Sequence, residues 1–126
     1  MLARRYRLNT SAEFARVRTL DQCWSDRRVV LCRAANGLAY TRFGIITSKR
    51  LGTAVVRNRA RRLISEAVRL QVTRLASGWD VVIIARRGMV GATYWDVERS
   101  LLRLLALAEL FAVTAPGGQP AEVVRG

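Results

Sequence analysis

The sequence of 126 residues contains no histidine. Without an imidazole, the chain cannot carry a Ser-His-Asp or Cys-His nucleophilic mechanism. It also lacks a common zinc ligand, and its two cysteines cannot by themselves complete a tetrahedral zinc site. These absences exclude most nucleophilic hydrolases and most zinc-dependent proteins.

Acidic residues are also scarce. Nine Asp and Glu stand against 22 Lys and Arg, which gives a net charge of +13 and a pI of about 11.6. No two acids form a convincing catalytic pair, because Asp96 and Glu98 lie two residues apart and would point in different directions on a helix. Asp96 is better explained as a helix cap, and Glu66 as an ion-pair partner of Arg62 or Arg69.

A protein nuclease needs carboxylates that bind metal, or a histidine base. The sequence therefore predicts a protein that binds a polyanion such as nucleic acid without cutting it, with no catalytic residue, no metal site and no cofactor of its own.

The chain has no apolar run near the roughly 20 residues that a membrane-spanning helix needs. Its basic beginning, 1–8, is not followed by the apolar segment of a signal peptide. Two cysteines, Cys23 and Cys32, are too few for a disulfide framework, so we expect reduced, partly buried thiols in a cytosolic protein.

A concentrated basic segment is the main feature that the chain does have. Between Lys49 and Arg62 there are six cations and no acid. A short β-branched strand over 43–48 precedes it, Gly52 turns the chain, and Thr53 can cap a helix predicted from Ala54 to about Ala76.

One face of this helix is polar, and its residues are Asn58, Arg61, Arg62, Ser65 and Arg69, with Arg59 at the edge. The apolar face has Val56, Ala60, Leu63, Ala67 and Leu70. Like charges repel along a helix, so unrelieved positive charge on one element favours a polyphosphate partner over an ordinary solvated helix rich in arginine.

The rest of the chain predicts a small domain around this helix. A capping box, Thr10–Glu13, begins a helix that runs to about Arg18. Strands are predicted over 29–32 and 41–48, and the Asn36-Gly37 turn between them indicates an antiparallel hairpin. Gly78 should end the basic helix, and an apolar strand over 79–85 completes a βαβ unit. A second capping box, Thr93–Asp96, begins a last helix that runs to about Val113.

The predicted fold is therefore α+β: a single domain of α-β-β-α-β-α order with a small mixed sheet. We expect a basic N-terminal arm over 1–9, a domain over 10–113 and a disordered tail over 114–126.

The basic segment resembles the signature of the bacterial ribonuclease P protein subunit. The matching positions are Gly44, Ser48, Lys49, Arg50, Gly52, Ala54, Val55, Arg57, Asn58, Arg59, Arg61, Arg62 and Glu66. The resemblance extends from about Leu8 to Leu110, and it includes a first helix with Phe14 and Val17. One departure lies within the motif, since Ser65 stands where the family usually has arginine.

The resemblance implies a ribosomal-protein-like fold whose βαβ crossover is left-handed, whereas most crossovers are right-handed. It implies that the chain is the protein subunit of the endoribonuclease that removes the 5′ leader from precursor-tRNA in the bacterial cytoplasm. The catalyst would be the RNA subunit, which coordinates Mg²⁺, and no catalytic residue is expected in the protein.

Two sets of site residues follow from the resemblance. The surface for the catalytic RNA would consist of Lys49, Arg50, Arg57, Asn58, Arg59, Arg61, Arg62 and Arg69. The cleft for the single-stranded leader would be lined by Phe14, Val17 and Arg18. Family members often have aromatics where Arg18 and Cys32 stand here, and Tyr40 is the nearest aromatic that could compensate.

Three alternatives stay open at this point. The chain could be a ribosomal or RNA-chaperone protein that uses the same basic helix without a catalytic RNA. It could also lie on an anionic membrane surface, although the basic helix has no exposed Trp or Phe anchor on its polar face. Phe14, for its part, could be an ordinary core residue.

Overall fold

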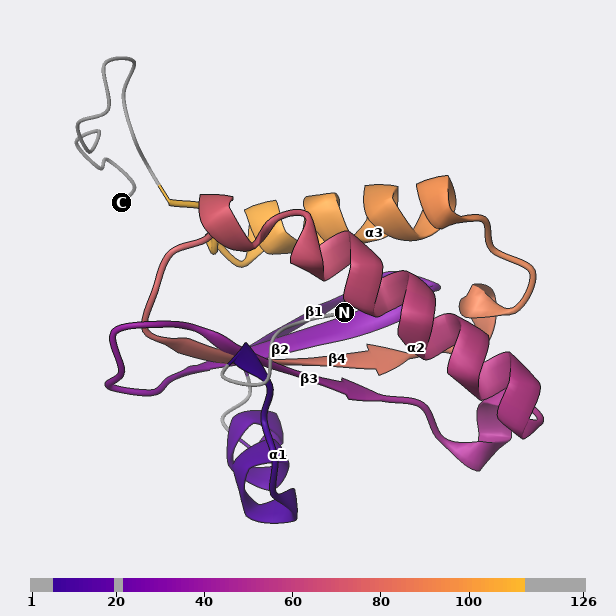
Figure 1. Ribbon diagram of the computed structural model, residues 1–126, viewed down its shortest axis with the longest axis horizontal. Helices are drawn as coiled ribbons and strands as arrows, with labels where there is room; N and C mark the ends of the chain where they lie inside the picture. The colour runs from indigo at the N-terminus through magenta and orange to yellow at the C-terminus, as the bar shows by residue number, and fades with distance from the viewer. Residues whose placement is uncertain (1–5, 20–21, 113–126) are drawn as a thin grey trace.

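The computed structural model describes residues 6–19 and 22–112 (Figure 1). The three α-helices of this part are α1 (Ser11–Arg18), α2 (Ala54–Arg69) and α3 (Tyr94–Leu107). The strands are β1 (Cys23–Ser25), β2 (Val29–Ala35), β3 (Arg42–Ile46) and β4 (Trp79–Ala85). Short 3₁₀ turns are η2 (Lys49–Leu51), η3 (Val72–Arg74) and η4 (Arg87–Met89). The α+β prediction and the order of the three predicted helices and three predicted strands are confirmed, and β1 is an additional strand.

The four strands form one mixed sheet in the order β1-β2-β4-β3. β4 pairs in parallel with β3 and antiparallel with β2, so it lies at the centre of the sheet. The predicted hairpin between β2 and β3 is therefore wrong. Asn36 and Gly37 do form a turn, with Gly37 at φ 71°, but the chain diverges after it and leaves room for β4.

Helices cover the two faces of the sheet unequally. α2 and α3 lie side by side over one face, and α1 lies alone on the opposite face (Figure 1). The larger core, between the sheet and the helix pair, includes Leu31, Ile64, Ile83, Leu101 and Leu104, all at most 1% exposed. A smaller cluster under α1 contains Leu8, Val17 and Val82. Because α1 is short, part of the sheet face around it stays open.

α2 is shorter than the predicted helix. It ends at Arg69, with Leu70 as C-cap, and not near Ala76. Its 16 residues rise about 24 Å, which matches the roughly 23 Å of the seven-residue β4. The chain must then cross back to the start of β4, and the residues between, with η3, make that connection. Gly78, at φ 91°, ends the connection rather than the helix.

The two cysteines are bonded to each other, which corrects the expectation of free thiols. Cys23 on β1 lies opposite Cys32 on β2, and a disulfide joins their sulfur atoms. The three-residue β1 carries no periodic signal of its own, so the sequence did not reveal that the two side chains face each other.

The ends of the predicted domain lie partly outside the described residues. Leu8 anchors the N-terminal segment, because it is 6% exposed and its N–H donates to the Phe43 carbonyl oxygen at 2.8 Å. Arg4 and Arg5, Val113 and the predicted tail over 114–126 lie outside the described part. The left-handed crossover stays a prediction. Among the helices of the described residues, none has the length and apolar character needed to cross a membrane.

Candidate nucleic-acid interface

The beginning of α2 and the preceding η2 carry cations that no acid neutralises. Within residues 6–19 and 22–112, the side chains of Lys49, Arg50, Arg57 and Arg62 form no hydrogen bond or ion pair. The first turn of α2 contains no acidic residue. Four acids of the same part of the chain, Glu13, Glu66, Asp80 and Asp96, form ion pairs elsewhere, with Arg16, Arg28, Arg42, Arg69 and Arg99. The positive charge of this surface is therefore uncompensated.

Two other predicted RNA-binding residues, Arg59 and Arg61, are held by neutral oxygen atoms. Arg59 donates to the Ala92 carbonyl oxygen at 2.8 Å, and so reaches toward the loop before α3. Arg61 donates to the Thr47 hydroxyl at 2.6 Å and to the Asn58 side-chain oxygen at 3.4 Å. These bonds orient the two guanidinium groups without removing their charge. Asn58 thus helps to orient Arg61.

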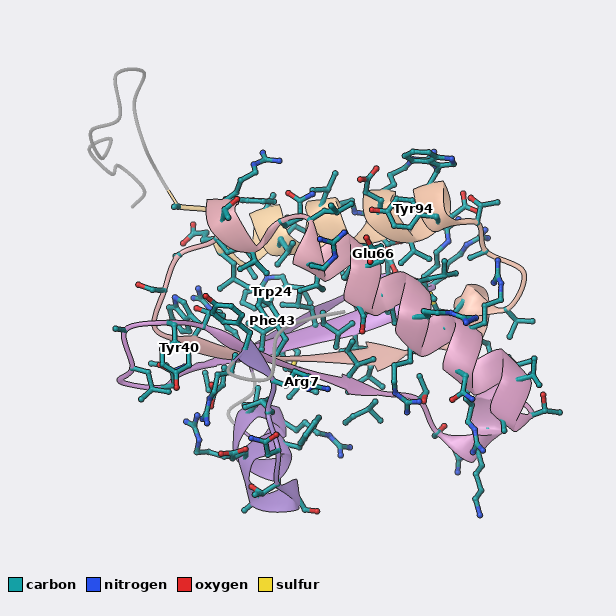
Figure 2. The ribbon with its side chains drawn as sticks, viewed as in Figure 1. Arg7, Trp24, Tyr40, Phe43, Glu66 and Tyr94 are labelled. Carbon is teal, nitrogen blue, oxygen red and sulfur yellow. A yellow bond between two sulfur atoms is a disulfide. The ribbon has the colours of Figure 1, made fainter. Side chains whose placement is uncertain are left out.

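Arg69 differs from the rest of the predicted RNA-binding set. It pairs with Glu66, which lies three residues before it on α2. The hydrogen bond from Arg69 lowers the pKa of Glu66, so the pair stays ionised. Glu66 lies beside Tyr94 where α2 meets α3 (Figure 2).

Ser65, which the sequence placed on the polar face, is buried. The cationic surface is therefore concentrated in η2 and in α2 up to Arg62.

A recess lies along β3, the edge strand of the sheet, between the N-terminal segment and α2. It has a volume of about 180 Å³, and Phe14, Gly44 and Arg61 are among the residues that line it. Gly44 allows Phe14 to lie directly on the strand, since a Cβ at position 44 would stand 2.3 Å from Phe14 Cε2. Phe14 therefore separates this recess from a second, shallower one of about 470 Å³, which Arg18 and Ile46 help to line.

The sheet face beside α1 is aliphatic. Val30, Ile84 and Ile46 lie in register across β2, β4 and β3, and all three are only partly buried. Arg18 is exposed at the end of α1. Val17, in contrast, is fully buried. This member of the predicted cleft packs between α1 and the sheet and does not line the cleft.

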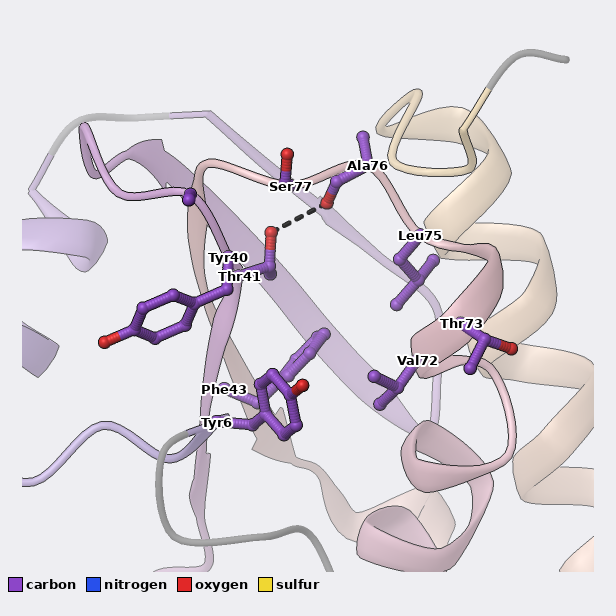
Figure 3. A pocket seen from close by; sticks show the side chains of 10 residues that line it. Tyr6, Tyr40, Thr41, Phe43, Val72, Thr73, Leu75, Ala76 and Ser77 are labelled. Atoms are coloured by element: carbon purple, nitrogen blue, oxygen red, sulfur yellow. Dashed lines mark hydrogen bonds between the residues drawn. The ribbon is translucent and has the colours of Figure 1, made fainter. Parts of the chain in front are cut away.

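The two other positions that were considered for stacking lie away from the groove. Cys32 is 3% exposed and bonded to Cys23, so it offers no platform. Tyr40 lines a different pocket of about 200 Å³, with Tyr6 and Phe43 (Figure 3). The rings of Tyr6 and Tyr40 meet edge to face, with their centroids 6.2 Å apart. Tyr40 therefore does not replace the missing aromatics beside Phe14.

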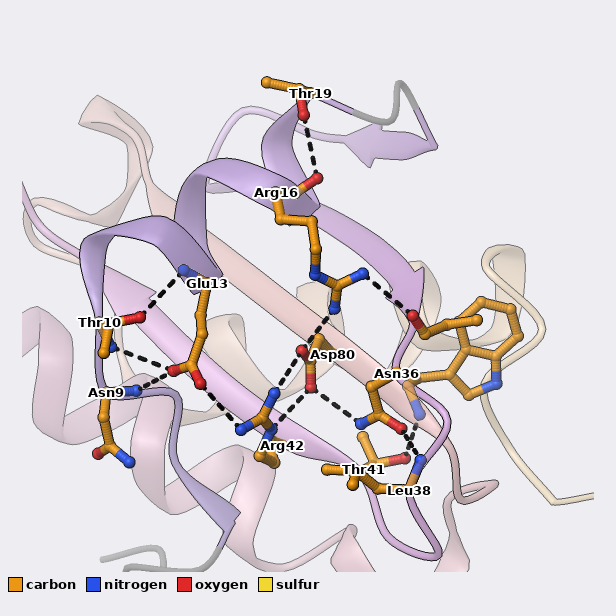
Figure 4. A network of polar contacts seen from close by, with 12 residues as sticks. Asn9, Thr10, Glu13, Arg16, Thr19, Asn36, Leu38, Thr41, Arg42 and Asp80 are labelled. Atoms are coloured by element: carbon orange, nitrogen blue, oxygen red, sulfur yellow. Dashed lines mark hydrogen bonds and ion pairs between the residues drawn. The ribbon is translucent and has the colours of Figure 1, made fainter.

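A buried polar network holds α1 against the sheet, and sequence reasoning missed it (Figure 4). Its centre is Asp80 of β4, which is 0% exposed. Arg42 donates to both Asp80 carboxylate oxygens, at 3.0 and 2.8 Å, and Arg16 of α1 donates at 2.7 Å. Asn36 donates a fourth hydrogen bond at 2.9 Å. The only sequence signal was an acid at the start of an apolar strand, where burial would require cationic partners.

Glu13 extends this network to the beginning of α1. Its carboxylate accepts hydrogen bonds from the backbone of Asn9 and Thr10, which confirms the predicted capping box, and it pairs with Arg42 at 3.0 Å. These backbone hydrogen bonds lower the pKa of Glu13. Burial raises the pKa of Asp80, but the hydrogen bonds from its partners outweigh burial and hold it below the ordinary value. Both carboxylates therefore stay ionised and fix the orientation of α1.

Comparison with known proteins identifies the family. The family model "Ribonuclease P" matches residues 2–109. The chain belongs to the ribonuclease P protein family. The ribonuclease P protein component of Herpetosiphon aurantiacus is 38% identical over 110 residues, which cover 87% of this chain and 89% of that protein. That of Roseiflexus castenholzii is 47% identical over 85 residues, which cover 68% and 70%.

Solved structures of the family share the fold. The RNase P protein of Staphylococcus aureus superposes with a TM-score of 0.78 at 30% identity, over 84% of this chain and 97% of that one. The Thermotoga maritima protein gives 0.72 at 27% identity, over 79% and 94%. A Staphylococcus aureus variant with defective mRNA degradation activity gives 0.79 at 30% identity, over 85% and 91%. Family membership assigns this chain to an endoribonuclease holoenzyme with a catalytic RNA partner.

Proposed function

We propose that this protein binds the catalytic RNA of ribonuclease P through η2 and the part of α2 up to Arg62, and holds the 5′ leader of precursor-tRNA in the groove beside α1. The observation that carries the proposal is the uncompensated charge of Lys49, Arg50, Arg57 and Arg62. RNA phosphates would supply the missing negative charge, and the released counterions would drive binding.

The two surfaces are continuous with each other. Arg61 belongs to α2, yet it lines the same recess as Phe14. An RNA strand that follows the cations of α2 would therefore reach the α1 groove past Arg61. A chaperone or ribosomal protein needs the basic helix but has no need for a groove that begins at its edge.

The groove is suited to bases without sequence readout. Phe14 offers one aromatic wall, and the aliphatic row Val30, Ile84 and Ile46 offers an apolar floor. Apolar and aromatic walls accept unstacked bases of any sequence. Arg18 would contribute a phosphate contact or lie flat on a base.

The protein would supply no group for bond cleavage. Among residues 6–19 and 22–112, no cluster of three acids or cysteines could hold a metal ion. Mg²⁺ would be bound by the RNA subunit, and the protein would act in the cytoplasm by positioning the precursor-tRNA and screening phosphate repulsion.

Reconstitution with the cognate RNA tests the proposal. We expect the protein to restore precursor-tRNA cleavage at a low Mg²⁺ concentration at which the RNA alone is inactive. The Arg57→Ala, Arg62→Ala double variant should require several-fold more protein to do so, because RNA affinity falls. Equal activation by the wild type and the double variant would contradict the assignment of α2 to the catalytic RNA.

A further inference from the structure

A second cluster of cations lies where the two parallel strands end. β3 leads into η2, and β4 leads into η4, so the carboxyl ends of both strands lie at the same edge of the sheet. This brings Arg50 next to Arg86 and Arg87, which are 36 and 37 residues away in the sequence. The three side chains line a recess of about 260 Å³, with Leu51 and Ala85 as its apolar walls.

The charge of this recess is unbalanced. Arg50 and Arg87 have no hydrogen-bond or ion-pair partner within the described part of the chain. Arg86 donates to the Asp26 carbonyl oxygen at 2.8 Å, which fixes the side chain but leaves its charge unneutralised. Three guanidinium groups around one hollow repel one another unless an anion lies between them.

The loop that carries two of the three arginines is firmly seated. A Cβ at Gly88 would stand 2.3 Å from the Arg27 carbonyl oxygen, so the loop lies directly on the turn between β1 and β2. Met89, the last residue of η4, is 1% exposed. The cations are therefore held in place before any ligand arrives, which lowers the entropic cost of binding.

We infer that the recess formed by Arg50, Arg86 and Arg87 binds a backbone phosphate of the catalytic RNA, an inference that rests on the proposed function. Its volume is below the 300–1,000 Å³ typical of sites for larger ligands, and it suits a compact anion. Arginine is the side chain best matched to the oxygens of a phosphate. Arg50 lies beside Lys49 in η2, so the recess continues the cationic surface of α2 onto the end of the sheet.

An RNA phosphate is favoured over a lipid phosphate by this continuity with the α2 surface. Trp95 on α3 is 66% exposed, however, and a tryptophan of this kind can anchor a protein in a lipid interface. Binding to vesicles therefore needs its own arm in the experiment.

The experiment uses the Arg50→Ala, Arg87→Ala double variant of the full chain. Binding to the catalytic RNA is measured over a series of salt concentrations. We expect weaker binding and a log–log salt slope reduced by roughly 0.7 to 0.9 for each lost phosphate contact. Arg86 is left in place because its bond to the β1–β2 turn could support the fold. Arg74→Ala is the matched control, since Arg74 lies in η3, after the end of α2, where it contacts Gln71 and Phe111 and no acid.

Three outcomes would overturn the inference, and they can be told apart. An unchanged slope in the double variant, with a reduced slope in Arg57→Ala, would overturn the recess and keep the proposed function. Unchanged slopes in both would overturn the proposed function as well. Loss of binding to phosphatidylglycerol vesicles or to inorganic phosphate, with RNA binding unaffected, would assign the recess to a different phosphate source.

Discussion

Phe14 shows how one side chain defines a site. The absence of a side chain at Gly44 lets the ring lie on the strand, and the ring then forms a wall of two neighbouring recesses. Arg18 lies at the rim of the second recess and brings a positive charge close to Phe14.

We predict that Phe14→Ala and Arg18→Ala each weaken the affinity of the holoenzyme for precursor-tRNA and leave mature tRNA almost unaffected, because only the precursor carries a leader. Stacking on one aromatic contributes about 1–3 kcal/mol per base, which sets the size of the Phe14 effect. The loss for Arg18→Ala should shrink at high salt. The measurement is the affinity for both RNAs at two salt concentrations.

Gly44→Ala is a second variant for the same test, and it changes the position of the Phe14 ring without replacing Phe14. The new methyl group would displace the ring, so this variant should reproduce the precursor-specific loss of Phe14→Ala. If the variants weakened the binding of precursor and mature tRNA equally, the groove would not be the leader site.

Asp80 is a residue-scale source of pH dependence. Its pKa is lowered in the folded protein, so the stability that it contributes is complete above its unfolded value near 3.8 and is lost as the pH falls through the folded value. We predict that the free energy of unfolding falls steeply below about pH 4. Asp80→Asn should cost about 3 kcal/mol at neutral pH, since it leaves the arginines of a buried ion pair without an anion.

Chemical denaturation at a series of pH values measures both effects. The wild type should lose stability toward low pH more steeply than Asp80→Asn, which has no carboxyl group to titrate at this position. The same steepness in both proteins would show that other groups, such as Glu13, dominate the acid response.

At the scale of the element, α2 separates paired from unpaired cations along a single helix. Arg57 and Arg62 have no partner within the described residues, whereas Arg69 pairs with Glu66. This contrast provides a matched test of which arginines serve RNA.

We predict that Arg57→Ala lowers the log–log salt slope of RNA binding by roughly 0.7 to 0.9, while Arg69→Ala changes it by less. The reason is that Arg69 already has a carboxylate partner and offers less free charge to a phosphate. The fold should survive both changes, because neither side chain contributes to the core. Loss of apo stability with unchanged RNA affinity in Arg57→Ala would mean that this arginine is structural.

Local pattern was enough to predict most elements and the parallel pairing of β3 with β4, but not the partner of β2. Capping boxes at Thr10 and Thr93 marked the beginnings of α1 and α3 correctly, and the apolar run over 79–85 marked β4. The predicted end of the last helix near Val113 is wrong, because α3 ends at Leu107. The partner of each strand is a long-range choice, and the Asn36-Gly37 turn favoured a hairpin that β4 displaces. β4 takes the central position because it is the most apolar strand and both its edges need hydrogen-bond partners.

The candidate site was predicted to a similar degree. The cations of α2 could be found because they follow one another along the chain, and Phe14 lies at a groove as the resemblance implied. The Asp80 network and the recess at Arg50, Arg86 and Arg87 bring together residues from distant elements. These residues come together only when α1, the strands and the 3₁₀ turns pack in the folded protein.

At the scale of the whole molecule, the protein carries a strong positive charge, with 22 Lys and Arg against nine Asp and Glu. The sequence contains no histidine, and the described acids are dispersed or held in ion pairs. The Staphylococcus aureus variant with defective mRNA degradation activity makes a direct test of this point worthwhile.

We predict that the highly purified protein, without the RNA subunit, cleaves neither precursor-tRNA nor an unstructured mRNA in the presence of Mg²⁺. The measurement is gel analysis of end-labelled RNA, with the reconstituted holoenzyme as the positive control. Cleavage that persists through further purification, and that is lost in an Asp or Glu variant of this chain, would show a catalytic group that the described residues do not reveal.

The central position of β4 also governs how the protein can form during its own synthesis. β2 and β3 each pair with β4 and not with each other, and β4 is the last strand of the described part of the chain. A nascent chain that has not yet reached about residue 85 therefore has both neighbours of the missing strand but no way to join them. Until then, α2 has no completed sheet on which to bury its apolar side. The growing polypeptide must be bound by chaperones, or must be synthesised quickly, to avoid aggregation. Folding should thus occur late and in one step, after the ribosome has released most of the domain.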